Sequence, residues 1–280
     1  ADYIRAKSIK GQSWNMTINF NTIILEKDAR GLATLTLNRP ERHHAFNAEM
    51  IAELTAAADH IRTEEAIRLV VIKSEGSSFC AGADLAWMKA QQDADRAGKM
   101  AEATKLAMML KAFHDLPKPV IARVQGQAFG GGLGLMAVAD IVIAVEDARF
   151  ALTETRLGLI PATIGPFVMA KIGGAAARSV FITGSLMSSR RAADLGLVSI
   201  VATADMLDKC VAREVKTALS AGPGAMALAK QMVQEITASD LDSQIVSAIE
   251  HLADCWESEE TQKGIAAFFA KTPPPWQVES

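Results

Sequence analysis

Cysteine is scarce in this chain of 280 residues. The three cysteines, Cys80, Cys210 and Cys255, lie far apart and form no CxxC pair. A sparse, odd set of this kind argues against a disulfide framework and against a zinc site. The sequence therefore favours a reducing compartment, and we expect a cytoplasmic protein with no bound metal.

Long hydrophobic runs are missing as well. The longest apolar stretches are far shorter than the roughly 20 residues that a membrane-spanning helix requires, so we expect no membrane partner. Residues 1–15 lack the apolar segment of a secretory signal. We interpret these residues as a flexible arm or an artificial remnant and leave them out of the fold.

Neither sign of charge dominates, because the formal net charge is −3. A protein that binds nucleic acid through a global positive field is therefore not expected. Half of the residues are hydrophobic and 22% are charged, which is ordinary for a globular protein and excludes a disordered chain. A chain of this length buries about three quarters of the surface that its unfolded form exposes.

Short apolar segments alternate with helical patterns in the first 200 residues, which predicts an α/β fold. The predicted strands are a hairpin over 22–37 and buried strands at 68–73, 120–124 and 141–145. The predicted helices are one capped by Asn47, one that follows Asp84 and one over about 93–114.

The pattern changes after about residue 200. Helical patterns follow one another at 203–221, 224–237 and 241–270, with little strand signal. We therefore divide the chain into an α/β core at 16–200 and a helical region at 201–280.

Common nucleotide-binding and hydrolase motifs do not fit. No GxxxxGK[ST] and no GxSxG occurs. Gly132, Gly134 and Ala137 formally match a dinucleotide fingerprint. That fingerprint needs a strand directly before it and an acidic residue about 20 positions later, and the sequence pattern offers neither. We expect no nicotinamide cofactor.

Two loops of small residues each precede a helical run: FCAGADL at 79–85 and GQAFGGGLG at 126–134. Each is either a tight turn or a loop whose backbone N–H groups, at a helix start, bind developing negative charge. Together, two such loops can place two N–H groups around one oxygen, as an oxyanion hole requires.

Glu154 is an acidic residue in the otherwise apolar stretch FALTETRLGLIP at 150–161. It is either a surface glutamate beside Arg156 or a partly buried carboxyl group. Burial raises the pKa of a carboxyl group and suits it to acid–base catalysis.

These stretches, in this order, resemble the crotonase, or enoyl-CoA hydratase/isomerase, superfamily. The early segment LTLNRPERHHAFN fits as well, so that the resemblance runs from about residue 20 to 272. The details CAGADLAWM, GGGLGL and RLGLIPATIGP are most similar to bacterial 3-methylglutaconyl-CoA hydratases and to related hydratases of branched isoprenoid acyl-CoAs.

The resemblance implies a fold, a reaction and an assembly. The fold is α/β, with a crotonase-like ββα spiral core and a helical C-terminal region that serves oligomerisation. The reaction is the addition of water to an α,β-unsaturated acyl-CoA, or its removal. CoA enters as part of the substrate, with no separate cofactor, and the expected assembly is a homotrimer or a dimer of trimers.

The same resemblance assigns roles to residues. The backbone N–H groups of Ala81 and Gly131 would form the oxyanion hole, and Glu154 would exchange a proton at the acyl α-carbon. The residues expected to bind the substrate are Arg42, Ala45, Gly82, Ala83, Asp84, Gly130 and Trp87. For Trp87, shaping the acyl pocket and packing in the core remain alternatives.

The main departure from the family pattern is Gly134, which stands where hydratases of the family carry a second glutamate. With one carboxylate, a double-bond isomerase that uses Glu154 alone and a non-catalytic acyl-CoA-binding protein are alternatives to a hydratase. The absent side chain also suggests room, and less repulsion, for a substrate carboxylate at Gly134. A smaller departure is His44, where asparagine is usual. We expect it to be a histidine on a surface loop.

Overall fold

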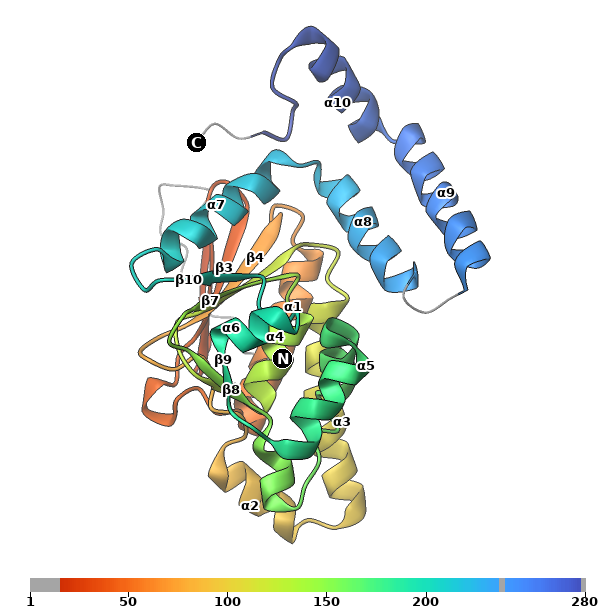
Figure 1. The fold of residues 1–280 in the computed structure, drawn as a ribbon. Coiled ribbons are helices and arrows are strands. Elements are labelled where there is room, and N and C mark those ends of the chain that lie inside the picture. Colours follow the sequence, from red (N-terminus) through yellow and green to blue (C-terminus); the bar gives the residue numbers. More distant parts are fainter. Residues whose placement is uncertain (1–15, 237–239, 278–280) are drawn as a thin grey trace.

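The computed structural model describes residues 16–236 and 240–277, in which a central sheet lies between two layers of helices (Figure 1). The sheet contains, in spatial order, β1 (Met16–Asn19), β2 (Ile23–Lys27), β3 (Leu32–Leu37), β4 (Leu69–Ser74), β5 (Val120–Val124), β7 (Ile141–Val145) and β10 (Ile200–Ala202). β1, β2 and β3 pair antiparallel, and the strands from β3 onward are parallel. A smaller sheet consists of β6 (Ala128–Phe129), β8 (Arg149–Ala151) and β9 (Met187–Ser188). The α/β class and the predicted hairpin are confirmed.

Helices connect and cover these strands. The first group is α1 (Ala48–Thr63), α2 (Leu85–Asp93), α3 (Arg96–His114), α4 (Gly131–Val138), α5 (Gly165–Thr183) and α6 (Ser189–Asp194), with 3-10 turns η1 (Pro40–Arg42) and η2 (Thr153–Leu157). The second group is α7 (Leu207–Ser220), α8 (Pro223–Ile236), α9 (Leu241–Glu257) and α10 (Glu259–Ala270).

Both faces of the central sheet are buried, which explains why its strands appear as continuous apolar runs. Side chains alternate along a strand. Leu69 and Val71 of β4 therefore pack beneath α7, whereas Val70 and Ile72 face the larger core, which α1, α3 and α4 cover. The two hydrophobic layers hold the carboxyl ends of β4 and β5 in place. The two loops of small residues, at 79–85 and 126–134, follow these strand ends.

Two predicted helix starts are confirmed by their caps. The Asn47 side chain accepts a hydrogen bond from the N–H of Met50 at 2.9 Å, and α1 begins at Ala48. The Asp84 carboxylate accepts from the N–H of Ala86 at 2.9 Å, and α2 begins at Leu85. Side-chain acceptors of this kind satisfy N–H groups that have no partner inside the helix.

Two details differ from the sequence prediction. The helix predicted over 241–270 is two helices, because the Ser258 hydroxyl caps a new start by accepting from the Thr261 N–H at 3.1 Å. A short strand, β6, lies within the 126–134 stretch, directly before its three consecutive glycines. A strand of two residues is too short to show an alternating pattern in the sequence. The segment interpreted as an arm, residues 1–15, lies outside the described residues.

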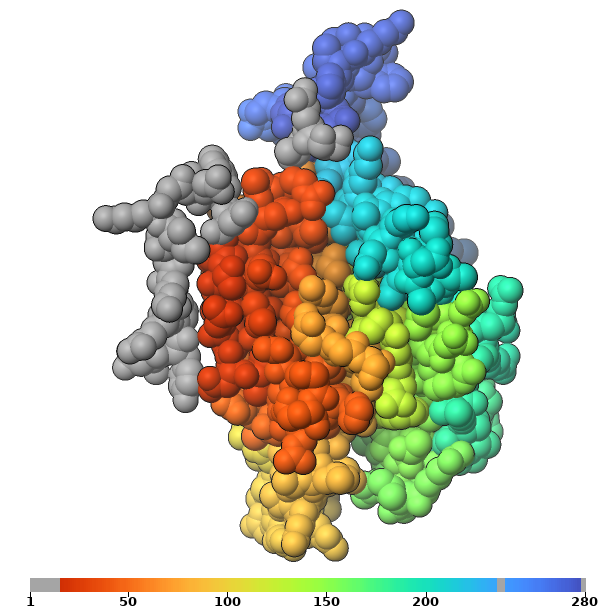
Figure 2. Space-filling view, turned by 90° about the vertical axis from the view of Figure 1, so that its left-hand side faces the viewer, coloured from red at the N-terminus to blue at the C-terminus, as the bar shows by residue number. Residues whose placement is uncertain are grey.

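The C-terminal helices α8–α10 extend away from the body (Figures 1 and 2). Lys230 of α8 anchors them by donating to the Asp140 carboxylate at 2.9 Å and to the Lys118 carbonyl at 3.2 Å. Much of their apolar surface is uncovered, and Phe268 and Phe269 are 78% and 79% exposed. Within residues 16–236 and 240–277, no helix combines the length and the hydrophobicity needed to cross a membrane.

We expect the Asn47→Ala variant to lower the free energy of unfolding by about 1 kcal/mol, because the Met50 N–H loses its acceptor at the start of α1. Chemical denaturation measures this loss. Asn47→Asp is the matched control, since it keeps an acceptor oxygen and should stay close to the wild type. Equal stability of the alanine variant and the wild type would show that the cap contributes nothing.

Candidate functional site

The loop at 79–84 is held against the early segment by backbone pairing. Phe46 and Ala83 form a parallel bridge, in which the Phe46 N–H donates to the Gly82 carbonyl at 2.7 Å. The Asp84 N–H in turn donates to the Phe46 carbonyl at 2.9 Å. In a parallel bridge of this kind the central residue, Ala83, directs its own N–H away from the partner strand. The N–H of Ala83 is therefore available on the opposite side.

The predicted role of the Ala81 N–H is wrong. This group donates to the carbonyl of His43 at 2.9 Å, so it cannot also hold a substrate oxygen. The register of the loop explains the error, because the pairing with residues 43–46 uses the N–H groups of Ala81 and Asp84 and leaves that of Ala83. Motif matching identified the loop but not the residue within it.

Gly131, the other expected donor, lies at the start of a helix. It is the first residue of α4, so its N–H has no partner within the helix. A Cβ at this position would lie only 2.7 Å from Cδ2 of Phe46, which explains why glycine is needed. The two loops touch, since a Cβ on Gly82 would lie 3.7 Å from the Cα of Gly130. The helix start and the 79–84 loop thus approach each other through backbone alone.

Glu154 lies beside this pair of loops, in η2. Its Oε1 would be 3.2 Å from a Cβ on Gly130. Its Oε2 is buried and has no hydrogen-bond partner within the described part of the chain. Burial raises the pKa of Glu154 above its ordinary value. Arg156 is exposed, whereas Glu154 is half-buried with its Oε2 enclosed, so of the two alternatives the structure favours the partly buried carboxyl group over a surface glutamate beside Arg156.

The space at Gly134 is not empty, and the expectation of room for a substrate carboxylate there is wrong. A Cβ on Gly134 would lie 2.8 Å from Cγ2 of Ile164 and 2.9 Å from Cδ1 of Leu110. Both distances are shorter than any normal carbon contact. The apolar core has closed over the position at which the family's second glutamate would begin.

Comparisons with known proteins identify the family. A profile described as enoyl-CoA hydratase/isomerase matches residues 27–279. The chain belongs to this family. It is 32% identical over 263 residues to the 1,2-epoxyphenylacetyl-CoA isomerase of Escherichia coli, covering 90% of this chain and 97% of that protein. It is 30% identical over 256 residues to the crotonyl-CoA hydratase of Syntrophomonas wolfei, covering 90% and 96%.

A solved structure gives the same result for the fold. The enoyl-CoA hydratase structure from Shewanella pealeana superposes with a TM-score of 0.84 at 36% identity, over 88% of this chain and 92% of that chain. The fold is therefore that of the crotonase superfamily, and the chain is an enzyme of the enoyl-CoA hydratase/isomerase family.

In this family member, an unpredicted arginine connects the loops of the candidate site. The guanidinium group of Arg39 donates to the Ala45 carbonyl at 2.7 Å and to the Asp84 carboxylate at 3.1 Å. The ion pair is largely buried, and it contributes to a lowered pKa of Asp84, although burial of that carboxyl group acts in the opposite direction. Arg42, by contrast, is exposed. No sequence motif distinguished Arg39 from Arg42, because their difference depends on the turn between them.

Trp87 lies in the first turn of α2 and is half-buried. Its Nε1–H donates to Oε2 of Glu102 at 3.2 Å, and its ring packs against the main core. Glu102 was not predicted as part of the site. The Trp87–Glu102 contact joins α2 to α3.

The prediction that His44 is a surface histidine is wrong. The side chain is fully buried. Its Nδ1 accepts from the Arg39 N–H at 3.0 Å, and its Nε2 lies 2.6 Å from the Glu75 carbonyl oxygen. An isolated histidine in a polar stretch gave no signal for such burial.

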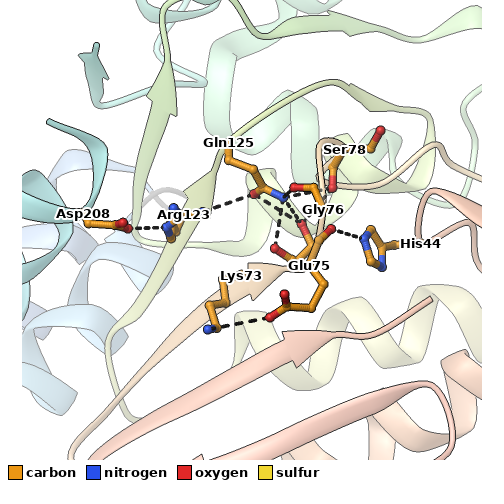
Figure 3. Close-up of polar contacts among 9 residues, drawn as sticks. His44, Lys73, Glu75, Gly76, Ser78, Arg123, Gln125 and Asp208 are labelled. Atoms are coloured by element: carbon orange, nitrogen blue, oxygen red, sulfur yellow. Dashed lines mark hydrogen bonds and ion pairs between the residues drawn. The ribbon is translucent and has the colours of Figure 1, made fainter. Parts of the chain in front are cut away.

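A cavity lies apart from the candidate site. It has a volume of about 500 Å³, is lined in part by residues of β3, β4, β5 and α7, and contains none of the predicted site residues. Its charged groups already pair, as Arg123 does with Asp208 at 2.6 Å and Lys73 with Glu75 at 4.0 Å (Figure 3). Among the described residues, no group of three or more His, Cys, Asp or Glu side chains could hold a metal ion.

We expect Gly134→Ala to lower the free energy of unfolding by about 1–3 kcal/mol, because its methyl group would overlap Ile164 and Leu110. Gly174→Ala is the matched control. A Cβ on Gly174 meets nothing within 4 Å, so this variant should be as stable as the wild type or slightly more so. Thermal and chemical unfolding of both variants test the comparison, and an unperturbed Gly134→Ala protein would mean that the core at Gly134 is open.

Proposed function

We propose that this enzyme moves a proton at the α-carbon of an unsaturated acyl-CoA thioester, with Glu154 as its acid and base. The observation that carries the proposal is the half-buried Glu154 carboxylate, whose Oε2 is enclosed without a hydrogen-bond partner among the described residues and which lies beside the start of α4. Burial raises the pKa of Glu154, which suits the group to both accepting and returning a proton.

The N–H groups of Ala83 and Gly131 are the proposed donors to the thioester oxygen. Removing a proton from the α-carbon, or adding a nucleophile at the β-carbon, moves negative charge onto that oxygen. Two preorganised N–H donors stabilise the enolate-like species, and each such donor contributes about 10²–10³ in rate. Gly131 has the additional advantage of a helix N-terminus, where the aligned peptide dipoles favour negative charge.

The reaction that we favour is hydration of 3-methylglutaconyl-CoA or a related branched enoyl-CoA. Its support is the similarity of the CAGADLAWM, GGGLGL and RLGLIPATIGP stretches to hydratases of this type. Glu154 would take a proton from water as the water adds at the β-carbon and deliver a proton to the α-carbon. A single carboxylate performs both steps if it works on one face of the substrate.

Double-bond isomerisation is the second candidate, and the packing at Gly134 favours it. Because Ile164 and Leu110 occupy the space there, no second carboxylate shares the work with Glu154 from this position. An isomerase needs one group only, which removes a proton from one carbon of the substrate and returns it to another. The E. coli relative is named as an isomerase. A non-catalytic acyl-CoA-binding protein would not require the buried carboxylate at all.

Several predicted features complete the proposal. Arg42, Ala45 and the 82–84 loop would bind the CoA part of the substrate, with no separate cofactor. The exposed apolar side chains of α9 and α10 would be covered in a homotrimer or a dimer of trimers. The division at residue 200, the cytoplasmic location and a role of Trp87 in the acyl pocket stay predictions.

We expect Glu154→Gln to abolish turnover while the affinity for CoA thioesters changes little, because the amide keeps the shape but cannot exchange the proton. Crotonyl-CoA and 3-methylglutaconyl-CoA are offered to both proteins, with enoyl absorbance and product mass recorded. A gain of one water by the wild type alone supports hydration. A shifted double bond without mass change supports isomerisation. If the variant keeps full activity, or if both proteins bind without turnover, Glu154 is not the acid–base group.

We expect kcat to fall as the pH decreases through the raised pKa of Glu154. As a base, the group must be ionised, and burial favours its protonated form, so the acidic limb lies above the ordinary pH range of a glutamate. The pH profile of kcat at saturating substrate measures this limb. A profile that is flat down to the ordinary glutamate pKa would contradict a buried base.

A further inference from the structure

His44 joins two backbone segments that together carry the proposed CoA-binding residues. One segment is the turn at 39–46, and the other is the chain at 75–84 that follows β4. The His44 side chain is 0% exposed and lies between them. Figure 3 shows its ring directed at the carbonyl of Glu75.

The two contacts of the ring define its protonation state. Nδ1 faces the N–H of Arg39, which can only donate, so Nδ1 must be the acceptor. Nε2 lies 2.6 Å from the Glu75 carbonyl oxygen, which can only accept, so Nε2 carries the proton. A neutral ring satisfies both contacts. A doubly protonated ring would place an N–H against the N–H of Arg39 in a site closed to water.

The turn around His44 is also the frame of the 79–84 loop. His43 and His44 both have positive φ, 49° and 55°, a conformation that is unfavourable for residues of this size. Their carbonyl groups accept from the 79–84 loop: that of His43 from the Ala81 N–H at 2.9 Å, and that of His44 from the Cys80 thiol at 3.1 Å. The ring contacts hold the strained turn, and the turn holds the loop.

A separate set of hydrogen bonds, from Gln125, holds the backbone on both sides of Glu75. The side-chain amide of Gln125 lies 3.0 Å from the carbonyl oxygens of Ser74 and Ser78 and 3.1 Å from that of Gly76 (Figure 3). The backbone around Glu75 is therefore held in place. The hydrogen bond from His44 to the Glu75 carbonyl holds the turn at 39–46 against this backbone.

We propose that neutral His44 is a positioning residue for the CoA-binding loops, and that its protonation weakens the affinity for CoA thioesters at low pH. The inference rests on the proposed function, because the loops are taken to bind CoA. His44 touches no substrate in this account. It acts through the backbone of residues 39–46 and 79–84.

The surrounding charges agree with a neutral ring at physiological pH. Burial lowers the pKa of His44 below its ordinary value, and the neighbouring His43 acts in the same direction. Glu41 and Glu75 act in the opposite direction. Arg39, which belongs to the turn itself, pairs with Asp84 of the 79–84 loop. The pKa of His44 is therefore lower than that of an ordinary histidine, and the ring becomes charged only on acidification.

The test compares two variants that do not titrate. His44→Asn suits the positive φ and keeps an acceptor near the Nδ1 position, and it gives up the bond to Glu75. His44→Gln reaches toward Glu75 and gives up the acceptor for Arg39. His60→Gln is the control, because the pKa of His60 is also lowered by burial but its side chain lies on α1 and contacts neither loop.

Calorimetric binding of CoA and of crotonyl-CoA is measured from pH 5 to 8 in a Glu154→Gln background, which removes the other titrating group. At pH 7.5 we expect the His44 variants to bind about tenfold more weakly than the background protein, the equivalent of one hydrogen bond. Below pH 6.5 the difference in affinity between the background protein and the His44 variants should become smaller. The background protein, which keeps His44, loses affinity as this ring becomes charged. Protonation of CoA itself affects all the proteins equally, so it does not contribute to the difference between them. The His60→Gln protein should follow the background at every pH.

Steady-state kinetics with native Glu154 give a second readout. We expect the His44 variants to raise KM, and any fall in kcat to accompany that rise, since the 79–84 loop also carries the Ala83 N–H that is proposed as an oxyanion donor. A proton–nitrogen NMR spectrum of the histidine rings should show the Nε2–H form for the signal that disappears in His44→Asn. Circular dichroism checks that each variant is folded.

Three results would overturn the inference: equal affinities at pH 7.5, a difference that stays constant with pH, or a fall in kcat at unchanged KM. A wild-type protein that binds no CoA compound at any pH would instead refute the proposed function itself.

Discussion

The candidate site depends on the close approach of two backbone segments with no side chain between them. Gly82 and Gly130 are in near contact, and Gly131 faces the ring of Phe46 at a distance that excludes even a methyl group. A β-bridge fixes the N–H group of Ala83 and a helix start fixes that of Gly131, so the two donors that we propose are held in place before any substrate binds. Widening either contact would displace both donors at once.

The carboxylate beside these donors has no counter-charge, which is the second physical constraint. An unpaired buried carboxyl group reduces stability in its ionised form, so its environment shifts its pKa rather than neutralising it with a cation. The ion pair between Arg39 and Asp84 connects the loops and does not involve Glu154. The fold thus separates the groups that position the backbone from the one group that can exchange a proton.

Much of this arrangement was predictable from sequence, and the errors have a common cause. Apolar alternation and the caps at Asn47 and Asp84 are local features, so the hairpin, three buried strands of the central sheet and two helix starts followed from them, whereas the place of Glu154 beside the two loops came from the family resemblance. The assignment of Ala81 failed because the free donor is decided by the pairing of 79–84 with a segment about 40 residues away. His44 and Arg39 act through the same long-range pairing, and no local pattern reports it.

The packing around Gly134 also limits how this enzyme can change. Restoring a second carboxylate at Gly134 requires that Ile164 or Leu110 first become smaller, and each of those changes alone opens a cavity in the core. The intermediate steps therefore lose stability before any new chemistry is gained. The presence of a single carboxylate at the candidate site is thus coupled to the packing of the hydrophobic core around Gly134.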